Sequence, residues 1–186
     1  MSTVTKFIKS IEAQYLSSNS YHSNIHGADV LQSVHVLLTV GGLGGRLSAV
    51  QRMSLLVAAA AHDVGASMLF VSALCVYLHM RLTESTISAA HPGLSNNFLV
   101  ATGDEEALLR NDTSVLEHMH AYRLFKTFRE PGCNLYKNVS SGVYKAQRRI
   151  MIQVILRTDL AQHFEVGPAC LASCRGQDAH HVGLLY

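Results

Sequence analysis

The sequence predicts an all-α protein. Apolar residues recur at helical spacing in several segments, and short breaks rich in glycine, serine or proline separate these segments. No segment of useful length alternates between apolar and polar residues as a strand does. With 186 residues, of which 48% are hydrophobic and 15% charged, the chain is large and apolar enough for one domain with a real core. This composition excludes a disordered, solvated segment.

The first part of the chain predicts three helices. Residues 2–17 carry apolar side chains at helical spacing, and the polar run 17–20 ends this helix and can cap the next one. The second helix spans 21–40, contains no proline, and ends at the glycines of 41–45, which predict a flexible turn. The third helix, within 47–64, is so apolar that we expect it to be buried on most sides.

The later part of the chain begins with a loop and turn at Pro92. Helices are then predicted near 104–111, 114–128 and 143–163. Residues 166–186 lack helical periodicity and predict a loose tail. The helical pattern therefore ends before the chain does.

Charge, targeting signals and cysteine spacing indicate which partners and which cellular location to expect. The net charge is only +2, with 15 basic and 13 acidic residues, which argues against nucleic acid as a partner. The first residues lack the apolar core of a signal peptide, so we expect a cytoplasmic protein. Only 66–80 resembles a membrane segment, and these 15 residues are short for a span of ~20, which argues against a membrane role. Four scattered cysteines do not predict a disulfide framework.

Eleven histidines direct attention to a metal site, because histidine is the commonest metal ligand. His22 and His26 are four residues apart on the second predicted helix and should project from one face. His62 and Asp63 close the third helix, where the terminal turn lets both side chains reach one site. A buried aspartate after four alanines is costly unless a cation pairs with it. Each residue alone is explained as a capping or surface group, but the set together favours a metal centre.

Five sequence blocks occur in a characteristic order. They are YHSNIHGADV at 21–30, HDVG at 62–65, HPGLSNNFL at 91–99, NDTSVLEH at 111–118 and LRTDLAQHF at 156–164. Together they resemble the catalytic domain of class I 3′,5′-cyclic nucleotide phosphodiesterases. This resemblance implies an incomplete helical fold of the HD-type phosphohydrolases. Residues 1–165 would form part of the catalytic domain, and 166–186 an unmatched tail.

The resemblance implies hydrolysis of cAMP and/or cGMP to the 5′-monophosphate at a two-metal site. His26, His62 and Asp63 would bind Zn²⁺, and Asp63 would bridge to a second ion, Mg²⁺ or Mn²⁺. The residue types agree with this, because imidazole and carboxylate suit zinc whereas carboxylate and water suit magnesium. Two metals can activate a water and clamp an in-line displacement at phosphorus.

The resemblance also implies roles around the metals. His22 would be the general acid that protonates the leaving 3′ oxygen, and a histidine with a pKa of ~6.5 can donate a proton near neutral pH. Tyr21 would contact the substrate. The implied residues that hold the metal-bound waters are His91, Glu117 and Thr158.

The chain departs from the family pattern in two ways. Residues 66–90 separate HDVG from HPG, and removing them would restore the contiguous motif. We interpret them as an atypical insertion that arises from a retained intron or gene-model error, a hypothesis that a full-length transcript would decide. Second, no residue in 166–186 matches the family's fourth zinc ligand, an aspartate, or its purine-binding glutamine and aromatic residue. Nucleotide preference is therefore left open.

Two other functions remain open at the level of sequence. One is another HD-type phosphohydrolase acting on nucleotides, and the other is a catalytically incomplete helical fragment without enzymatic activity. The missing ligand predicts that the chain as written is weakly active or inactive. Exposed core faces would favour association of the chain with itself, as a homo-oligomer or an aggregate.

Overall fold

The computed structural model describes residues 1–16, 19, 21–65 and 94–161. Within these ranges the chain forms helices and no strand, which confirms the all-α prediction. The insertion at 66–90, His91 and the tail at 166–186 lie outside the described residues. The helices are α1 (Thr3–Glu12), α2 (Asn24–Thr39), the 3₁₀ helix η1 (Leu43–Arg46), α3 (Ala49–Ala61), α5 (Asn96–Thr102), α6 (Glu105–Leu109), α7 (Val115–Thr127) and α8 (Ser141–Leu156).

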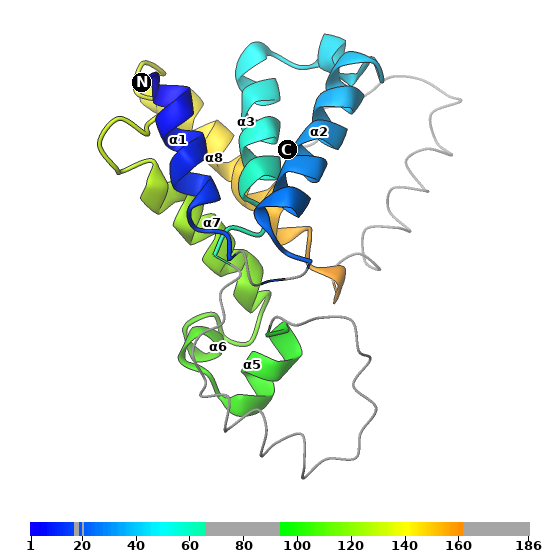
Figure 1. Cartoon of the computed structure of the whole chain (residues 1–186), viewed down its shortest axis with the longest axis vertical. Coiled ribbons are helices and arrows are strands. Elements are labelled where there is room, and N and C mark those ends of the chain that lie inside the picture. The colour runs from blue at the N-terminus through cyan, green and yellow to red at the C-terminus, as the bar shows by residue number, and fades with distance from the viewer. Residues whose placement is uncertain (17–18, 20, 66–93, 162–186) are drawn as a thin grey trace.

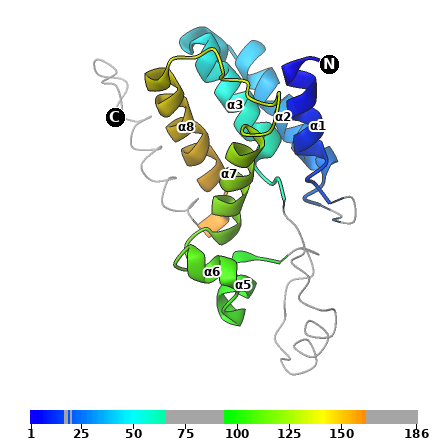
Figure 2. The ribbon, with the colours of Figure 1, turned by 90° about the vertical axis from the view of Figure 1, so that its left-hand side faces the viewer.

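Helix α3 is central to the packing. It contacts α2 on one side and α8 on another, while α7 packs against α8 and α1 (Figures 1 and 2). The short helices α5 and α6 lie beside the first turns of α7, away from the rest of the bundle (Figure 1). As a result, the end of α3 points toward the place where α2 and α7 begin.

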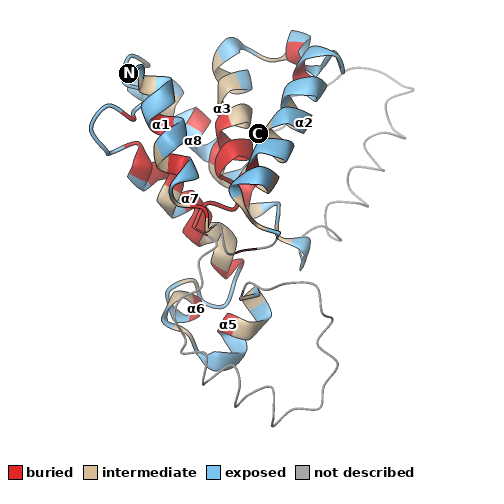
Figure 3. Cartoon of the chain, viewed as in Figure 1, coloured by how far each residue is buried: buried red, intermediate tan, exposed pale blue. Residues whose placement is uncertain are grey.

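The sequence of α3 explains both its start and its burial. Ser48 accepts a hydrogen bond from the backbone N–H of Gln51, and the Gln51 side chain accepts one from the Ser48 N–H, which forms a capping box. The last turn, Ala58–Ala61, is buried (Figure 3). These small side chains let neighbouring helices approach closely. Gly65 then turns the chain with a φ of 74°, a conformation that favours glycine.

A buried polar network connects α3 to α8. The Ser54 hydroxyl lies 2.9 Å from the Tyr136 hydroxyl and 2.9 Å from the Gln147 side-chain oxygen. The Ser54 hydroxyl also lies 2.8 Å from the carbonyl of Val50, and its single proton serves one of these acceptors at a time. All three side chains of the network are buried, and the hydrogen bonds among them set the relative position of the two helices.

A second, smaller core holds α5 and α6 against α7. Its buried residues are Leu99, Ala107 and Val115. Helix α5 lies in a segment for which the sequence predicted only a loop and turn. The helix begins because the Ser95 hydroxyl accepts the backbone N–H of Phe98 at 3.2 Å, and it ends at Gly103 with a φ of 63°.

Several predicted element boundaries differ from the structure. Helix α1 ends at Glu12 rather than residue 17, and helix α8 ends at Leu156 rather than 163. Helix α2 begins at Asn24 rather than residue 21, because the Asn19 side chain accepts the N–H groups of residues 21 and 22 and so holds them in a turn. The glycine-rich segment 41–45, expected to be a flexible turn, contributes to η1. At the start of α2, hydrogen bonds that hydrophobic periodicity does not report set the boundary.

Membrane-spanning helices are absent from the described part of the chain. No helix there has both the length and the apolar character needed to cross a bilayer.

Gly27 sets the approach of α2 to Tyr15, in the segment that follows α1. A Cβ atom at this position would lie 2.9 Å from the Tyr15 hydroxyl, and Tyr15 is buried and donates to the Ala60 carbonyl at 3.1 Å. We therefore expect Gly27→Ala to lower the free energy of unfolding by about 1–3 kcal/mol through overpacking. Thermal unfolding followed by circular dichroism measures this.

Gly142→Ala provides the matched control. Gly142 also lies in a helix, but a Cβ atom there meets nothing within 4 Å. Alanine should leave the stability unchanged or raise it by up to about 1 kcal/mol, since alanine favours helix more than glycine does. Equal melting temperatures for the two variants would contradict the steric role of Gly27.

Candidate metal centre

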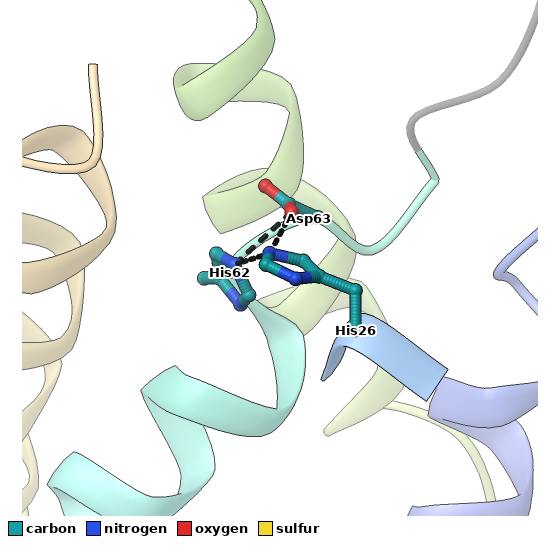
Figure 4. A group of neighbouring side chains, drawn as sticks. All are labelled: His26, His62 and Asp63. Carbon is teal, nitrogen blue, oxygen red and sulfur yellow. Dashed lines mark hydrogen bonds and ion pairs between the residues drawn. The ribbon is translucent and has the colours of Figure 1, made fainter. Parts of the chain in front are cut away.

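Three potential ligands meet where α2 and the end of α3 lie together. His26 comes from the first turn of α2, and His62 and Asp63 directly follow α3 (Figure 4). The Nε2 atoms of His26 and His62 are 3.2 Å apart, and they lie 3.4 and 3.0 Å from Asp63 Oδ2. One ligand atom from each residue lies within 4.8 Å of the other two, which is the proximity that a shared metal ion requires.

The protonation of His62 favours a cation at this point. Its Nδ1 atom lies 2.9 Å from the carbonyl oxygen of Ala59, and because a carbonyl only accepts, Nδ1 must donate. In the neutral ring, the lone pair of Nε2 is then available toward His26 and Asp63. Among the described residues, Asp63 Oδ2 is buried without a hydrogen-bond partner, and its short contacts are to three histidine rings. Nitrogen and oxygen donors with an unsatisfied carboxylate oxygen fit a divalent metal.

The electrostatics of the pair show that Asp63 draws positive charge to itself, which without a metal is a proton on His62. Burial opposes the charged form of Asp63, but the contact with His62 and the nearby His120 and His22 outweigh burial and lower the pKa of the carboxyl group. Burial likewise opposes the charged form of His62, but Asp63 outweighs it and raises the pKa of the ring. The carboxylate is therefore held ionised, as metal binding requires.

His22 and Tyr21 lie at the edge of this cluster. His22 Nε2 is 3.9 Å from Asp63 Oδ2, and the His22 ring packs edge-on against the His26 ring with centroids 5.9 Å apart. The Tyr21 ring contacts both histidine rings, at 5.0 and 4.8 Å, and is half exposed. His22 was predicted to lie on the second helix, one turn before His26. That prediction is wrong in its geometry, because residue 22 precedes α2, yet the turn at Asn19 still directs the ring to Asp63.

Glu117 approaches the same region from α7. Its carboxylate accepts a hydrogen bond from the Asn96 side chain at 2.9 Å, and the same Asn96 accepts the N–H of Leu116 at 2.9 Å. Burial is the main cause that raises the pKa of Glu117, and the charges of Asp159 and Asp63 add to it. Asn96 therefore orients Glu117 and satisfies one of the free N–H groups at the start of α7.

Among the described residues, no hydrogen bond or ion pair joins Thr158 to the cluster. Its hydroxyl donates to the carbonyl of Ile155 at 2.8 Å, at the end of α8. The neighbouring Asp159 accepts a hydrogen bond from Ser114 at 2.7 Å, which connects the end of α8 to the start of α7. His91, the other residue implied to hold waters, lies outside the described residues.

Two supporting residues have roles that sequence reasoning did not find. The Tyr15 hydroxyl donates to Ala60 O, and His120 Nδ1 lies 3.0 Å from Val64 O and donates to it. The bonds to residues 59 and 60 satisfy carbonyls in the last turn of α3 that the helix leaves free, and the bond from His120 holds the turn that follows the helix. The only available signal was the position of His120 one turn after Glu117.

Comparison with known proteins identifies the family. The family model described as "3'5'-cyclic nucleotide phosphodiesterase" matches residues 21–66 and 86–179. The chain belongs to the 3′5′-cyclic nucleotide phosphodiesterase family. The gap between the two matched ranges of this phosphodiesterase chain falls within 66–90, the segment expected to interrupt the pattern. The second range runs to residue 179, whereas the sequence blocks alone put the end of the resemblance near 165.

Curated relatives of the phosphodiesterase chain are longer proteins. The chain is 32% identical over 164 residues to 3′,5′-cyclic-AMP phosphodiesterase 4C of Rattus norvegicus, a match that covers 88% of this chain and 26% of the relative. The protein of the same name from Mus musculus is also 32% identical over 164 residues, with 88% and 20% covered. The chain thus spans about a quarter or less of these relatives.

Solved structures share the fold of the phosphodiesterase chain. The phosphodiesterase domain of Salpingoeca rosetta rhodopsin phosphodiesterase superposes with a TM-score of 0.66 at 28% identity, covering 88% of this chain and 41% of that domain. A structure of the phosphodiesterase domain of the RhoPDE fusion protein from the same organism gives a TM-score of 0.70 at 29% identity, covering 88% and 43%. The helical arrangement is therefore that of a phosphodiesterase domain, over less than half of its length.

Removal of one ligand tests the metal centre. His62→Ala should weaken zinc binding by more than about 100-fold, because loss of a direct ligand should exceed the effect of losing an outer-shell partner. Calorimetric titration of the protein with Zn²⁺ measures the affinity. His35→Ala is the control, since His35 is exposed on the same helix as His26 but outside the cluster. Equal zinc affinity in the wild-type and His62→Ala proteins would exclude this site.

His120 predicts a loss of stability in acid. Burial lowers the pKa of its ring from 6.5 to about 4. Since the unfolded state then binds more protons between these two values, stability should be full above pH 6.5 and fall as the pH drops to about 4. The loss from this group amounts to at most about 3 kcal/mol. Urea unfolding at several pH values measures it.

The comparison variant for this pH dependence is His120→Gln. It removes the titrating ring and should show a shallower decline of stability between pH 6.5 and 4, even though its stability at neutral pH is lower. His35→Gln, at an exposed position, should keep the wild-type slope. A slope for His120→Gln as steep as that of the wild type would show that another group causes the acid sensitivity.

Proposed function

We propose that this chain acts in the hydrolysis of a 3′,5′-cyclic nucleotide, cAMP or cGMP, to the 5′-monophosphate. Family membership supports the reaction class. The observation that carries the proposal is the convergence of His26, His62 and Asp63 around one buried carboxylate oxygen, with His22 beside it. Because the chain spans only part of its relatives, the activity, the substrates and the cytoplasmic location are proposals for this chain.

His26, His62 and Asp63 are proposed to hold Zn²⁺, and Asp63 is proposed to contact a second ion, Mg²⁺ or Mn²⁺. When bound, these ions supply Lewis acidity that activates water and neutralises charge on the phosphate. The protein's own contribution is positional. The bond of His62 to Ala59 O fixes the ring tautomer, and the burial of Asp63 prevents water from satisfying its Oδ2 atom.

His22 is proposed to donate the proton that the leaving 3′ oxygen takes up. Its Nε2 atom lies 3.9 Å from the Asp63 carboxylate, which places the imidazole beside the proposed metal centre. The turn held by Asn19 and the ring of Tyr21 limit where the imidazole can move. The half-exposed Tyr21 is proposed to contact the substrate.

The alternative of a non-catalytic helical fragment is supported by two observations. Within the described residues, the cluster offers only three protein ligands, and the chain covers 41–43% of the solved phosphodiesterase domains. We therefore expect turnover well below that of a complete domain. Self-association, which the exposed apolar residues of α2 favour, is a second consequence of the same partial coverage.

The activity assay uses the full chain with Zn²⁺ and Mg²⁺ on cAMP, cGMP and a 5′-mononucleotide. His22→Ala should reduce kcat on the cyclic nucleotide by about 10²–10⁴-fold, the usual contribution of a general acid, while zinc stays bound. His35→Ala is the control and should leave kcat unchanged. Zinc content is measured for each protein by atomic absorption.

Three outcomes would contradict the proposal. Equal turnover in His22→Ala would remove its role as the general acid. Activity on the mononucleotide alone would favour a different HD-type phosphohydrolase. A folded, zinc-loaded chain without any turnover would favour the non-catalytic fragment.

A further inference from the structure

A groove of about 630 Å³ lies at the opposite end of α7 from Glu117. It is formed by the last turns of α7, the segment 128–139 that follows, and the first turns of α8. None of the candidate metal ligands lines it. In Figure 2, this end of α7 and the start of α8 lie away from α5 and α6. The groove is therefore separate from the metal centre and is not used by the proposed reaction.

Positive charge is concentrated around this groove. Residues 122–149 contain seven of the 15 basic residues of the chain and one of its 13 acidic residues. The acidic residue, Glu130, accepts a hydrogen bond from Ser10 on α1 and does not line the groove. The basic side chains that line it are Lys126, Arg129, Lys137 and Arg148. None of these four forms an ion pair within the part of the chain that the structure describes, so their charge is available to an anion.

One wall of the groove is aromatic. The guanidinium of Arg148 lies over the Phe125 ring, 3.7 Å from its centroid. Phe125 packs on Phe128, Phe128 on Tyr136, and Tyr136 on Tyr144, with centroid separations of 5.9, 5.4 and 5.7 Å. Phe125, Phe128 and Tyr136 are buried, which keeps this series of rings fixed. The lining rings that remain open to a ligand are Tyr122, which is exposed, and Tyr144, which is half-buried. The groove thus combines a preformed aromatic surface with a set of cations.

We propose that this groove binds a nucleoside phosphate. Arginine and lysine bind phosphate through charge-assisted hydrogen bonds, and aromatic rings stack on nucleobases whatever their sequence. The volume lies within the range of about 300–1,000 Å³ that is usual for small-molecule sites. An anion without a ring would use the cations but leave the aromatic wall without a contact. This site does not depend on the proposed catalytic function.

Calorimetric titration of the full, zinc-loaded chain tests the proposal, with AMP as the probe and inorganic phosphate and adenosine as comparisons. We expect AMP to bind at least tenfold more tightly than either, because only AMP engages both the cations and the rings. His26→Ala, which alters the metal centre, should keep this binding. The result for that variant separates the groove from the active site, and failure of one proposal would not decide the other.

Two groove variants and one matched control identify the location. Arg148→Gln on α8 and Lys137→Gln in the preceding segment should each weaken AMP binding at least fivefold. Lys145→Gln, which is also exposed on α8 but does not line the groove, should not. Circular dichroism and thermal unfolding establish that each variant is folded.

Several results would overturn the assignment. They are the absence of AMP binding to the wild type, equal affinity for AMP and inorganic phosphate, and loss of binding in His26→Ala with none in the groove variants. Displacement of AMP by an acidic peptide at lower concentration than by GMP would also overturn it, since the groove would then be a peptide site.

Discussion

The structure depends on one electrostatic constraint, which is a carboxylate oxygen of Asp63 that is buried without a hydrogen bond. An ionised carboxylate in such a place is costly unless positive charge offsets it. The surrounding residues bury Asp63 and bring positive charge close to it. The alanines before it allow the end of α3 to lie deep in the bundle, and Gly65 turns the chain away under the side chain of Arg123. Three histidines then approach Asp63 from two segments.

The end of α3 shows how a fold can position a site through backbone groups. A helix leaves its last carbonyls without intrahelical partners. Here the side chains of His62 and Tyr15 donate to the carbonyls of residues 59 and 60 in the last turn of α3, and His120 donates to the carbonyl of residue 64 in the turn that follows. These donors come from three different parts of the chain, so the position of the metal centre is determined by the packing of α1 and α7 as well as by the ligands themselves.

The sequence predicted most of the helices and the central cluster, because hydrophobic periodicity and the four-residue spacing of histidines are direct consequences of helix geometry. It did not predict α5 or the true start of α2, since single side-chain-to-backbone bonds from Ser95 and Asn19 determine them. It also could not reveal that Asn96 orients Glu117, because 21 residues separate the partners and only tertiary structure brings them together. The roles of His22, Tyr21, Glu117 and Thr158 in catalysis stay predictions.

Helix α2 has few buried residues. Only Gly27 and Leu38 among its residues are buried, and much of its apolar surface is exposed. His26 lies in its first turn and reaches residues that follow α3. A cation bound by His26 on α2 and by the residues after α3 would therefore hold the two helices together. Its binding free energy would add to the local stability of α2 by mass action. The amide hydrogens of α2 would then exchange with solvent at a rate set by the free metal concentration, which makes this helix a reporter of occupancy at the centre.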